Sequence, residues 1–363
     1  MPLTLRGNMS DDVDKKSRTA LVTTGGLLVA AGLGILTPGL KDAFLAGLNK
    51  WFRLNLYLDA PPWAGGLLLA LGLILLLVAF IGQDRLERGL VRLSNGPGAT
   101  VGTFLAIKHV GFAPAVRDLR KAELPSGMAR RDLRHLEVDV SLELGSAPLQ
   151  IEAALAKQLR MPDQIGAILG VNPDADLGYC GIVQAPFQLL AGYQLASWLR
   201  LQSFEWHRHE QRWVPLANGA GADLKVATRT EALGGGTDLA IAVEVSYPIA
   251  AAEIAASVPA AGRLVRLGVA APSLDCVTHE GQAAELARQF REALDAARTL
   301  PAGARVHVFC AASMSVGFAL GRMVSRTLHP PVVVYAYDRN AAKPYPWGIE
   351  INGAPGAGQV VRN

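Results

Sequence analysis

Two long runs without charged residues constrain this chain more than any other feature of its sequence. Thr19–Leu40 is 22 residues long and Ala60–Gln83 is 24 residues long, and neither contains a charge. A helix needs about 20 apolar residues to cross a bilayer, and the mean hydropathy of +0.25 agrees with such segments. The alternatives are a buried core helix or a signal peptide, but a second span directly after a signal peptide is not expected. We therefore predict a transmembrane hairpin over residues 19–83, preceded by a polar tail, 1–18.

Basic residues around the two runs predict the orientation of the hairpin. Six of them lie just outside its ends, namely Lys15, Lys16, Arg18, Arg85, Arg88 and Arg92. The connecting loop has only Lys41, Lys50 and Arg53. Because basic residues favour the cytoplasmic side, both termini and everything after the hairpin are expected in the cytoplasm. Residues 84–99 form a basic juncture that ends in a linker, SNGPG.

The remainder, 100–363, has the pattern of an α/β domain. Between Arg305 and Glu350 an apolar run, a small polar turn, a helical run and a β-branched run follow one another. That order predicts a strand, a helix and a parallel strand, with a ligand site beyond the carboxyl end of the first strand. Tyr179–Trp206 repeats the order, and Gly192 and Gly321 hold matching positions 129 residues apart. We expect a duplicated domain with halves at about 100–236 and 237–353; a chance succession of α/β units is the alternative.

One turn in the second half resembles the nucleophile elbow of serine hydrolases. Ser313-Met314-Ser315-Val316-Gly317 lies between the predicted strand and helix and would make Ser315 the nucleophile. Such an enzyme needs an acidic residue and then a histidine downstream. The only histidine after Ser315 is His329, and it precedes Asp338. A membrane-tethered hydrolase that uses Ser315 therefore stays an alternative, and our first expectation is a protein without catalytic residues.

The sequence gives little support for a cofactor site or a metal site. No phosphate-binding P-loop is present, and no GxGxxG follows a strand. His207 and His209 share one face of a predicted strand, but no cysteine or carboxylate cluster completes a metal site. The three cysteines, Cys180, Cys276 and Cys310, have no CxxC spacing, which favours a reducing compartment. We expect no metal and no cofactor.

The residues at the two matching turns favour binding of an anionic ligand with bases. The helices that begin after Pro186 and Ser313 would point backbone N–H groups at an anion. The side chains expected to serve the same ligand come from both halves: Gln188, Ser313 and Ser315 as donors, Phe187 and Met314 as surfaces on which a base rests, Arg208 and Arg339 as partners of phosphate, and Trp347 as a stacking face.

The segments that carry these turns resemble a known family. GIVQAPFQLLAGYQLASW with FEWHRHEQRW, and VHVFCAASMSVGFALGRMVS with VVVYAYDR and PYPWGIEING, look like the two halves of a SAVED domain. The hairpin ahead of them is similar to that of two-transmembrane SAVED effectors of CBASS antiphage defence. The resemblance covers the chain from about Thr100 onward. It implies an α/β fold with two CARF-like, Rossmann-like halves.

The resemblance also implies a function and a ligand surface. The ligand would be a cyclic di- or trinucleotide made by a partner nucleotidyltransferase, and not polymeric nucleic acid. Ligand would drive homo-oligomerisation of a multi-pass protein of the bacterial inner membrane, and the clustered hairpins would disrupt that bilayer and abort infection. Carried over by motif, the ligand surface comprises Gln184, Pro186, Phe187 and Gln188 in the first half and Ser313, Met314, Ser315 and Tyr345 in the second. A membrane adaptor without a ligand is the third class of function left open.

Overall fold

The computed structural model describes residues 29, 50, 69–73, 102–112, 116–198, 200–353 and 358–363. The chain divides into two compact units, Met1–Ala99 and Thr100–Asn363. Apart from Val29 and a short helical stretch at 69–73, the two predicted spans lie outside the described residues. Among the residues that are described, no helix is both long and apolar enough to cross a bilayer. The hairpin therefore stays a prediction.

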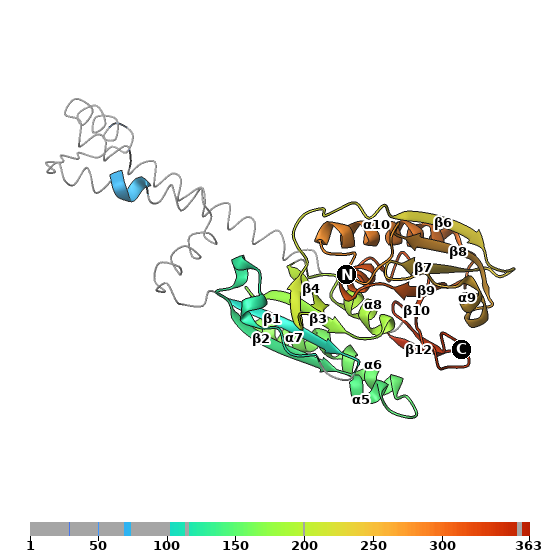
Figure 1. The fold of residues 1–363 in the computed structure, drawn as a ribbon. Coiled ribbons are helices and arrows are strands. Elements are labelled where there is room, and N and C mark those ends of the chain that lie inside the picture. The colour runs from blue at the N-terminus through green and yellow to red at the C-terminus, as the bar shows by residue number, and fades with distance from the viewer. Residues whose placement is uncertain are drawn as a thin grey trace. The chain divides into compact units, whose positions relative to one another are not determined.

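The second unit contains two sheets, and the first of them is built from the first half of the unit (Figure 1). Its strand order is β2-β1-β3-β4-β5. The first four strands are parallel and the last pairs antiparallel with β4. The strands are β1 (Thr103–Val110), β2 (Asp132–Asp139), β3 (Asp176–Ile182), β4 (Leu201–His207) and β5 (Arg212–Pro215).

The second sheet repeats this plan and extends it at both edges. Its order is β12-β11-β10-β9-β7-β8-β6, and the run β8-β7-β9-β10-β11 has the same order and strand directions as the first sheet. An α/β fold and a duplication are therefore both visible in the topology. The strands are β6 (Ala227–Ala232), β7 (Asp238–Glu244), β8 (Ala261–Gly268), β9 (Val306–Ala311), β10 (Val332–Ala336), β11 (Trp347–Glu350) and β12 (Gln359–Arg362).

The limits of the second half differ from those expected from the sequence. β6 begins at residue 227 and pairs antiparallel with β8, so the second sheet starts about ten residues before position 237. At the other end β12 adds a strand beyond position 353. Neither edge strand has a counterpart in the first half, and for this reason a comparison of repeats in the sequence cannot find them.

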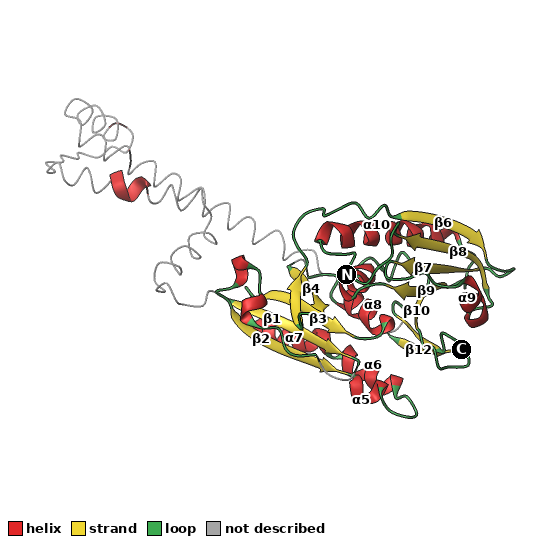
Figure 2. Ribbon diagram, in the orientation of Figure 1, coloured by secondary structure: helices red, strands yellow, loops and turns green. Residues whose placement is uncertain are grey.

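Helices cover the sheets and fill the space between them (Figure 2). Leu286, Phe290 and Leu294 recur at every fourth residue of the sequence and are buried along α10, as that spacing indicates for a helix with one apolar face. The α-helices are α5 (Ser141–Leu144), α6 (Ile151–Leu159), α7 (Met161–Val171), α8 (Ala185–Gln194), α9 (Ala251–Ser257), α10 (Glu280–Ala296) and α11 (Met314–Gly321). The 3-10 turns are η1 (Lys121–Glu123), η2 (Ser126–Met128) and η3 (Ala297–Thr299).

The two halves meet through their equivalent helices, α8 and α11. Each helix packs against its equivalent and also reaches the sheet of the other half, α8 at β10 and β11 and α11 at β3 and β4. Side chains from both halves accordingly share one large apolar core. The halves thus form one folded body, in which a helix of each half packs on the sheet of the other.

Two glycines allow the backbones of α8 and α11 to approach each other closely where the helices cross. A Cβ added to Gly192 would lie 2.0 Å from the carbonyl oxygen of Phe318, and one added to Gly321 would lie 1.9 Å from that of Leu189. Gly192 and Gly321 are 129 residues apart, and so are Leu189 and Phe318. The two contacts are therefore the same contact seen from each half, which is the signature of a local two-fold axis. The matching positions inferred from the sequence are confirmed at this crossing.

Candidate functional site

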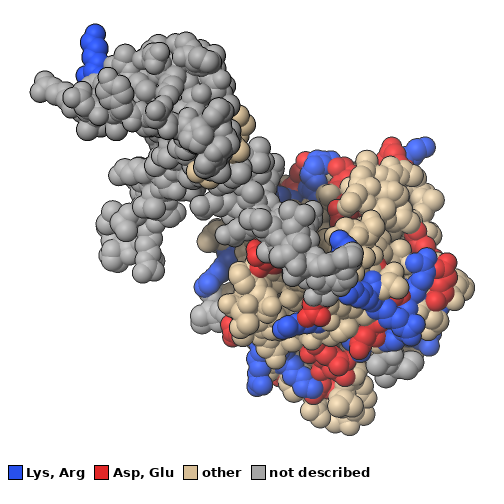
Figure 3. Space-filling view, turned by 90° about the vertical axis from the view of Figure 1, so that its left-hand side faces the viewer, with Lys and Arg blue, Asp and Glu red and all other residues tan. Residues whose placement is uncertain are grey.

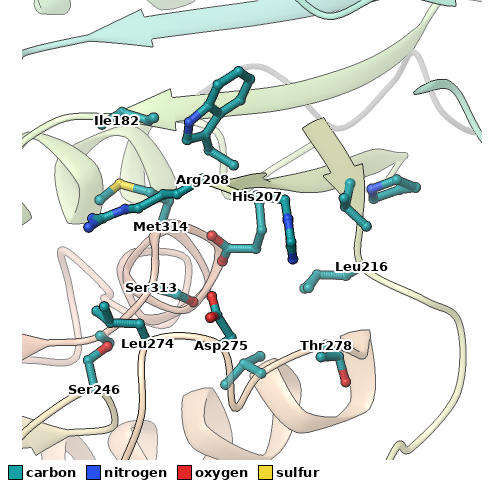
Figure 4. Close-up of a pocket in the computed structure, with 16 residues that line it drawn as sticks. Ile182, His207, Arg208, Leu216, Ser246, Leu274, Asp275, Thr278, Ser313 and Met314 are labelled. Atoms are coloured by element: carbon teal, nitrogen blue, oxygen red, sulfur yellow. The ribbon is translucent and has the colours of Figure 1, made fainter. Parts of the chain in front are cut away.

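A cavity of about 190 Å³ opens between the two halves, at the carboxyl ends of the parallel strands. The first half contributes the ends of β3, β4 and β5 and the residue after β5. The second half contributes the loops after β7, β8 and β9 and the first residue of α11. In Figure 4 His207, Arg208 and Met314 lie on one side, opposite Ser246, Leu274, Asp275 and Thr278. This is the place where α/β sheets bind ligands.

The wall of the cavity combines apolar and charged side chains. Trp206, Leu216, Val277 and Met314 provide apolar surface. Three groups are charged, namely Glu205, Arg208 and Asp275. A mostly apolar lining with a few polar groups is typical of sites for small organic ligands.

Glu205 joins the two halves at the cavity wall. It belongs to β4 of the first half, and its Oε1 accepts a 2.8 Å hydrogen bond from the backbone N–H of Ser315 in the first turn of α11. The hydroxyl of Ser315 donates to the same oxygen. Burial raises the pKa of the Glu205 carboxyl, and hydrogen bonds from Ser313, Ser315 and the backbone of Met314 oppose that rise. A carboxylate from one half therefore caps a helix of the other half.

This contact corrects the expectation of an open anion site at Ser313 and Ser315. The start of α11 does bind an anion, as the helix dipole favours, but the anion is the chain's own Glu205. Ser315 is only 1% exposed. Ser313 still lines the cavity beside Met314. A phosphate placed at the same N-terminus would face the Glu205 carboxylate.

The same geometry bears on the hydrolase alternative. The hydroxyl of Ser315 bonds with Glu205 and with Ser313. His329, the histidine downstream, accepts a hydrogen bond from the backbone N–H of Ser325 and contacts Asp295 instead. Among the described residues, the Ser315 hydroxyl is therefore bonded to a carboxylate and a second hydroxyl, and His329 is not one of its partners.

The matching turn of the first half, at Pro186, is buried and packs against the turn of the second half at Ser313. Phe187 is 0% exposed and belongs to the shared core. Pro186 is buried as well. The Gln188 amide lies under the cavity, where its Nε2 donates to the sulfur of Met314 at 2.8 Å and approaches the carbonyl oxygen of Ser313 at 3.5 Å. These residues hold the site in place and do not face it.

The other predicted ligand residues divide between core and surface. Gln184 donates from Nε2 to the carbonyl oxygen of Gly111 at 3.4 Å. Trp347 packs against Phe187 in the core, with ring centroids 6.0 Å apart. Tyr345 is 4% exposed in a second core cluster. Arg339 is exposed in the turn after β10. The structure thus gathers Arg208, Ser313 and Met314 at one cavity and places the rest beneath it or elsewhere.

Reasoning from the sequence missed several residues of the cavity. Glu205 carried a signal, because a carboxylate between Phe204 and Trp206 in an apolar strand must find donors when it is buried. Leu274, Asp275 and Thr278 come from a loop without a motif, and only the fold brings them to this place.

Solved structures of Cap4 SAVED/CARF-domain containing receptors are similar to this chain, with the Acinetobacter baumannii protein in complex with the cyclic trinucleotide 2'3'3'-cAAA at a TM-score of 0.44 and 11% identity. The Moraxella osloensis receptor has a TM-score of 0.39 and 10% identity. The alignments cover 83% of this chain but only 64% and 63% of those chains, which is less than two thirds of their length. No curated protein matches the chain.

A match to a family model is more direct. The model of the SAVED domain, the "SMODS-associated and fused to various effectors sensor domain", matches residues 164–351. That range is more than half of the chain and contains every residue that lines the cavity. The chain therefore belongs to the SAVED family.

Proposed function

We propose that this chain is a sensor whose SAVED domain binds a cyclic oligonucleotide in the cavity between its halves. The observation that carries the proposal is the cavity itself, since both halves of the duplicated domain line it at the carboxyl ends of their strands. Membership of a sensor-domain family supports it. The ligand class is a cyclic di- or trinucleotide, and the receptor complex named above contains the cyclic trinucleotide 2'3'3'-cAAA.

The chemistry of the wall suits one nucleotide of such a ligand. Trp206 and Met314 offer flat and polarisable surface for a base. Arg208 is exposed at the same cavity and can meet a phosphate as a charged donor. On the face shown in Figure 3, basic and acidic side chains are interspersed, which fits a small ligand better than a long polyanion.

The output of the sensor is proposed for the first unit. If the uncharged runs at 19–40 and 60–83 form a hairpin in the bacterial inner membrane, assembly of the SAVED domains would cluster the hairpins and disrupt the bilayer. The ligand must then bind the assembled state more tightly than the monomer, or it could not shift the population. Such a protein would serve CBASS antiphage defence by aborting infection, and a partner nucleotidyltransferase would make the ligand. It would need no catalytic residue of its own.

Binding is tested with the full chain and a panel of cyclic di- and trinucleotides that includes 3'3'3'-cAAA, measured by calorimetry. Arg208→Ala should weaken the best binder by about tenfold or more, because a hydrogen bond to a charged group contributes about 1.5–3 kcal/mol. Arg212→Ala is the matched control, since Arg212 lies outside the cavity and pairs with Glu210. No binding by any member of the panel would overturn the proposal.

The membrane output is tested separately. The full chain is reconstituted into vesicles loaded with a fluorescent dye, and the best binder of the panel is added. Dye release that depends on ligand and is lost in Arg208→Ala is the expected result. Binding without dye release would leave the sensor in place and refute the effector role of the first unit.

A further inference from the structure

The size of the cavity has a consequence for the rest of the ligand, if the proposed function holds. Its volume of about 190 Å³ is below the range of about 300–1,000 Å³ found for pockets that enclose drug-sized ligands. A cyclic di- or trinucleotide is larger than such ligands. The cavity can therefore take one base with part of its sugar, and the remaining nucleotides must lie on the surface around it.

Three exposed side chains of the second half lie at the same edge of the sheet. Tyr247, Leu274 and Tyr337 are 52%, 54% and 51% exposed. Leu274 lines the cavity, and Tyr247 directly follows Ser246, which also lines it. We call Tyr247 and Tyr337 the tyrosine shelf.

Strand order brings the two tyrosines of the shelf together. Tyr247 comes three residues after β7 and Tyr337 comes directly after β10, and β9 lies between these parallel strands. Strands in a sheet are about 4.8 Å apart, so the ends of β7 and β10 are separated by about 10 Å. Two tyrosine side chains at that spacing, both leaving the carboxyl edge, can offer one continuous surface.

Tyr337 of the shelf packs on a cluster of buried aromatic rings. The ring of Tyr337 lies 5.4 Å from that of the buried Tyr345, at an angle of 62°. Tyr345 in turn packs on Phe309 at 4.6 Å, and Phe309 stacks on Tyr335 at 5.1 Å with nearly parallel rings. Burial raises the pKa of the Tyr345 phenol, as expected for a ring inside this aromatic cluster. The half-exposed ring of Tyr337, which packs on Tyr345, loses little conformational freedom when a flat ligand covers it.

A nucleobase is the occupant that this surface and its position favour. Bases stack on aromatic side chains without regard to their identity, and Tyr247 directly follows Ser246, which lines the cavity. We propose that a second base of the cyclic oligonucleotide, next to the one in the cavity, stacks on Tyr247 and Tyr337. The shelf would then favour a cyclic oligonucleotide, whose second base can reach the two tyrosines, over a mononucleotide, whose single base occupies the cavity alone.

The test compares alanine with phenylalanine on the shelf of the full chain. The probe is a 3'3'3' cyclic triadenylate in which 2-aminopurine replaces adenine, and its affinity and fluorescence are measured. The double variant Tyr247→Ala/Tyr337→Ala should bind about 5- to 100-fold more weakly, with less quenching of the bound probe. Tyr247→Phe/Tyr337→Phe should keep both properties, since phenylalanine retains the ring. Binding of 5'-AMP should be equal in all three proteins.

The outcomes separate this inference from the proposed function. A wild-type chain that binds neither the probe nor the panel overturns both. Wild-type binding together with an unchanged affinity in the alanine double variant overturns the shelf alone. Self-association of the free protein that is lost in the alanine variant, at unchanged probe affinity, would assign the tyrosines to a contact between copies of this chain and likewise overturn the shelf. Equal melting temperatures of the variants and wild type exclude a folding defect.

Discussion

The crossing of α8 and α11 allows a sharp prediction for Gly192→Ala. The new Cβ would lie 2.0 Å from the carbonyl oxygen of Phe318, whereas ordinary contacts of a Cβ begin near 3.4 Å. The helices must therefore move apart by about 1.4 Å, in an interior that is packed like a crystal. Overpacking costs about 1–3 kcal/mol and occasionally more. Since the obstacle is backbone, which cannot rotate away like a side chain, we expect about 3 kcal/mol.

The measurement is the melting temperature of the full chain followed by tryptophan fluorescence. For a unit of this size, 1 kcal/mol lowers the melting temperature by about 2–4 °C, so Gly192→Ala should lose about 6–12 °C. Gly321→Ala should behave alike, because its Cβ would meet the carbonyl oxygen of Leu189 at 1.9 Å. The double variant should cost less than the sum, since helices that have parted for one methyl group already make room for the other.

Gly166→Ala is the matched control within a helix. Gly166 is exposed in α7, and a Cβ there meets nothing within 4 Å. Alanine is preferred over glycine in a helix by about 0.5–1 kcal/mol, so this variant should be slightly more stable than wild type. If Gly192→Ala and Gly321→Ala melt like Gly166→Ala, or if the double variant is strictly additive, the close crossing and its two-fold relation are refuted.

Two further predictions concern buried ionisable groups. His109 is 0% exposed, its Nδ1 lies 3.0 Å from the Tyr179 hydroxyl, and burial lowers its pKa to about 3. The unfolded state takes up a proton on this imidazole below pH 6.5 and the folded state does not, so the free energy of unfolding should fall from pH 6.5 toward pH 3, by about 2 kcal/mol at pH 5. His109→Gln should therefore show a smaller difference in melting temperature between pH 7 and pH 5 than wild type. An equal difference would contradict the lowered pKa of His109. Glu205→Ala should destabilise the full chain by about 2–4 kcal/mol in denaturant unfolding, because the backbone N–H and the hydroxyl of the buried Ser315 both lose this acceptor. Ser315→Ala should cost only about 1 kcal/mol, since the backbone N–H of Ser315 keeps its partner; a larger loss for Ser315→Ala than for Glu205→Ala would refute the cap.

The periodicity of apolar residues and the order of the predicted elements were enough to predict the α/β class of the second unit and its two similar halves. The stripe of α10 and the alternation of apolar runs predict an α/β domain, because helices and strands bury side chains with different periods. The matching glycines predict equivalent positions in two halves, and the contacts of Gly192 and Gly321 confirm them. The edge strands β6 and β12 escaped prediction, since they belong to one half only.

Which of the two matching turns lines the cavity was decided by the tertiary structure. The turns at Pro186 and at Ser313 have similar local patterns, yet the first is buried and the second lines the cavity. A local pattern specifies a turn but not what packs over it, and the order of strands and the crossing of α8 and α11 make that choice. For the same reason Glu205, 110 residues before Ser315 in the chain, could not be read as its cap. The carboxylate on β4 and its donors at the start of α11 meet only when the two halves of the domain pack against each other.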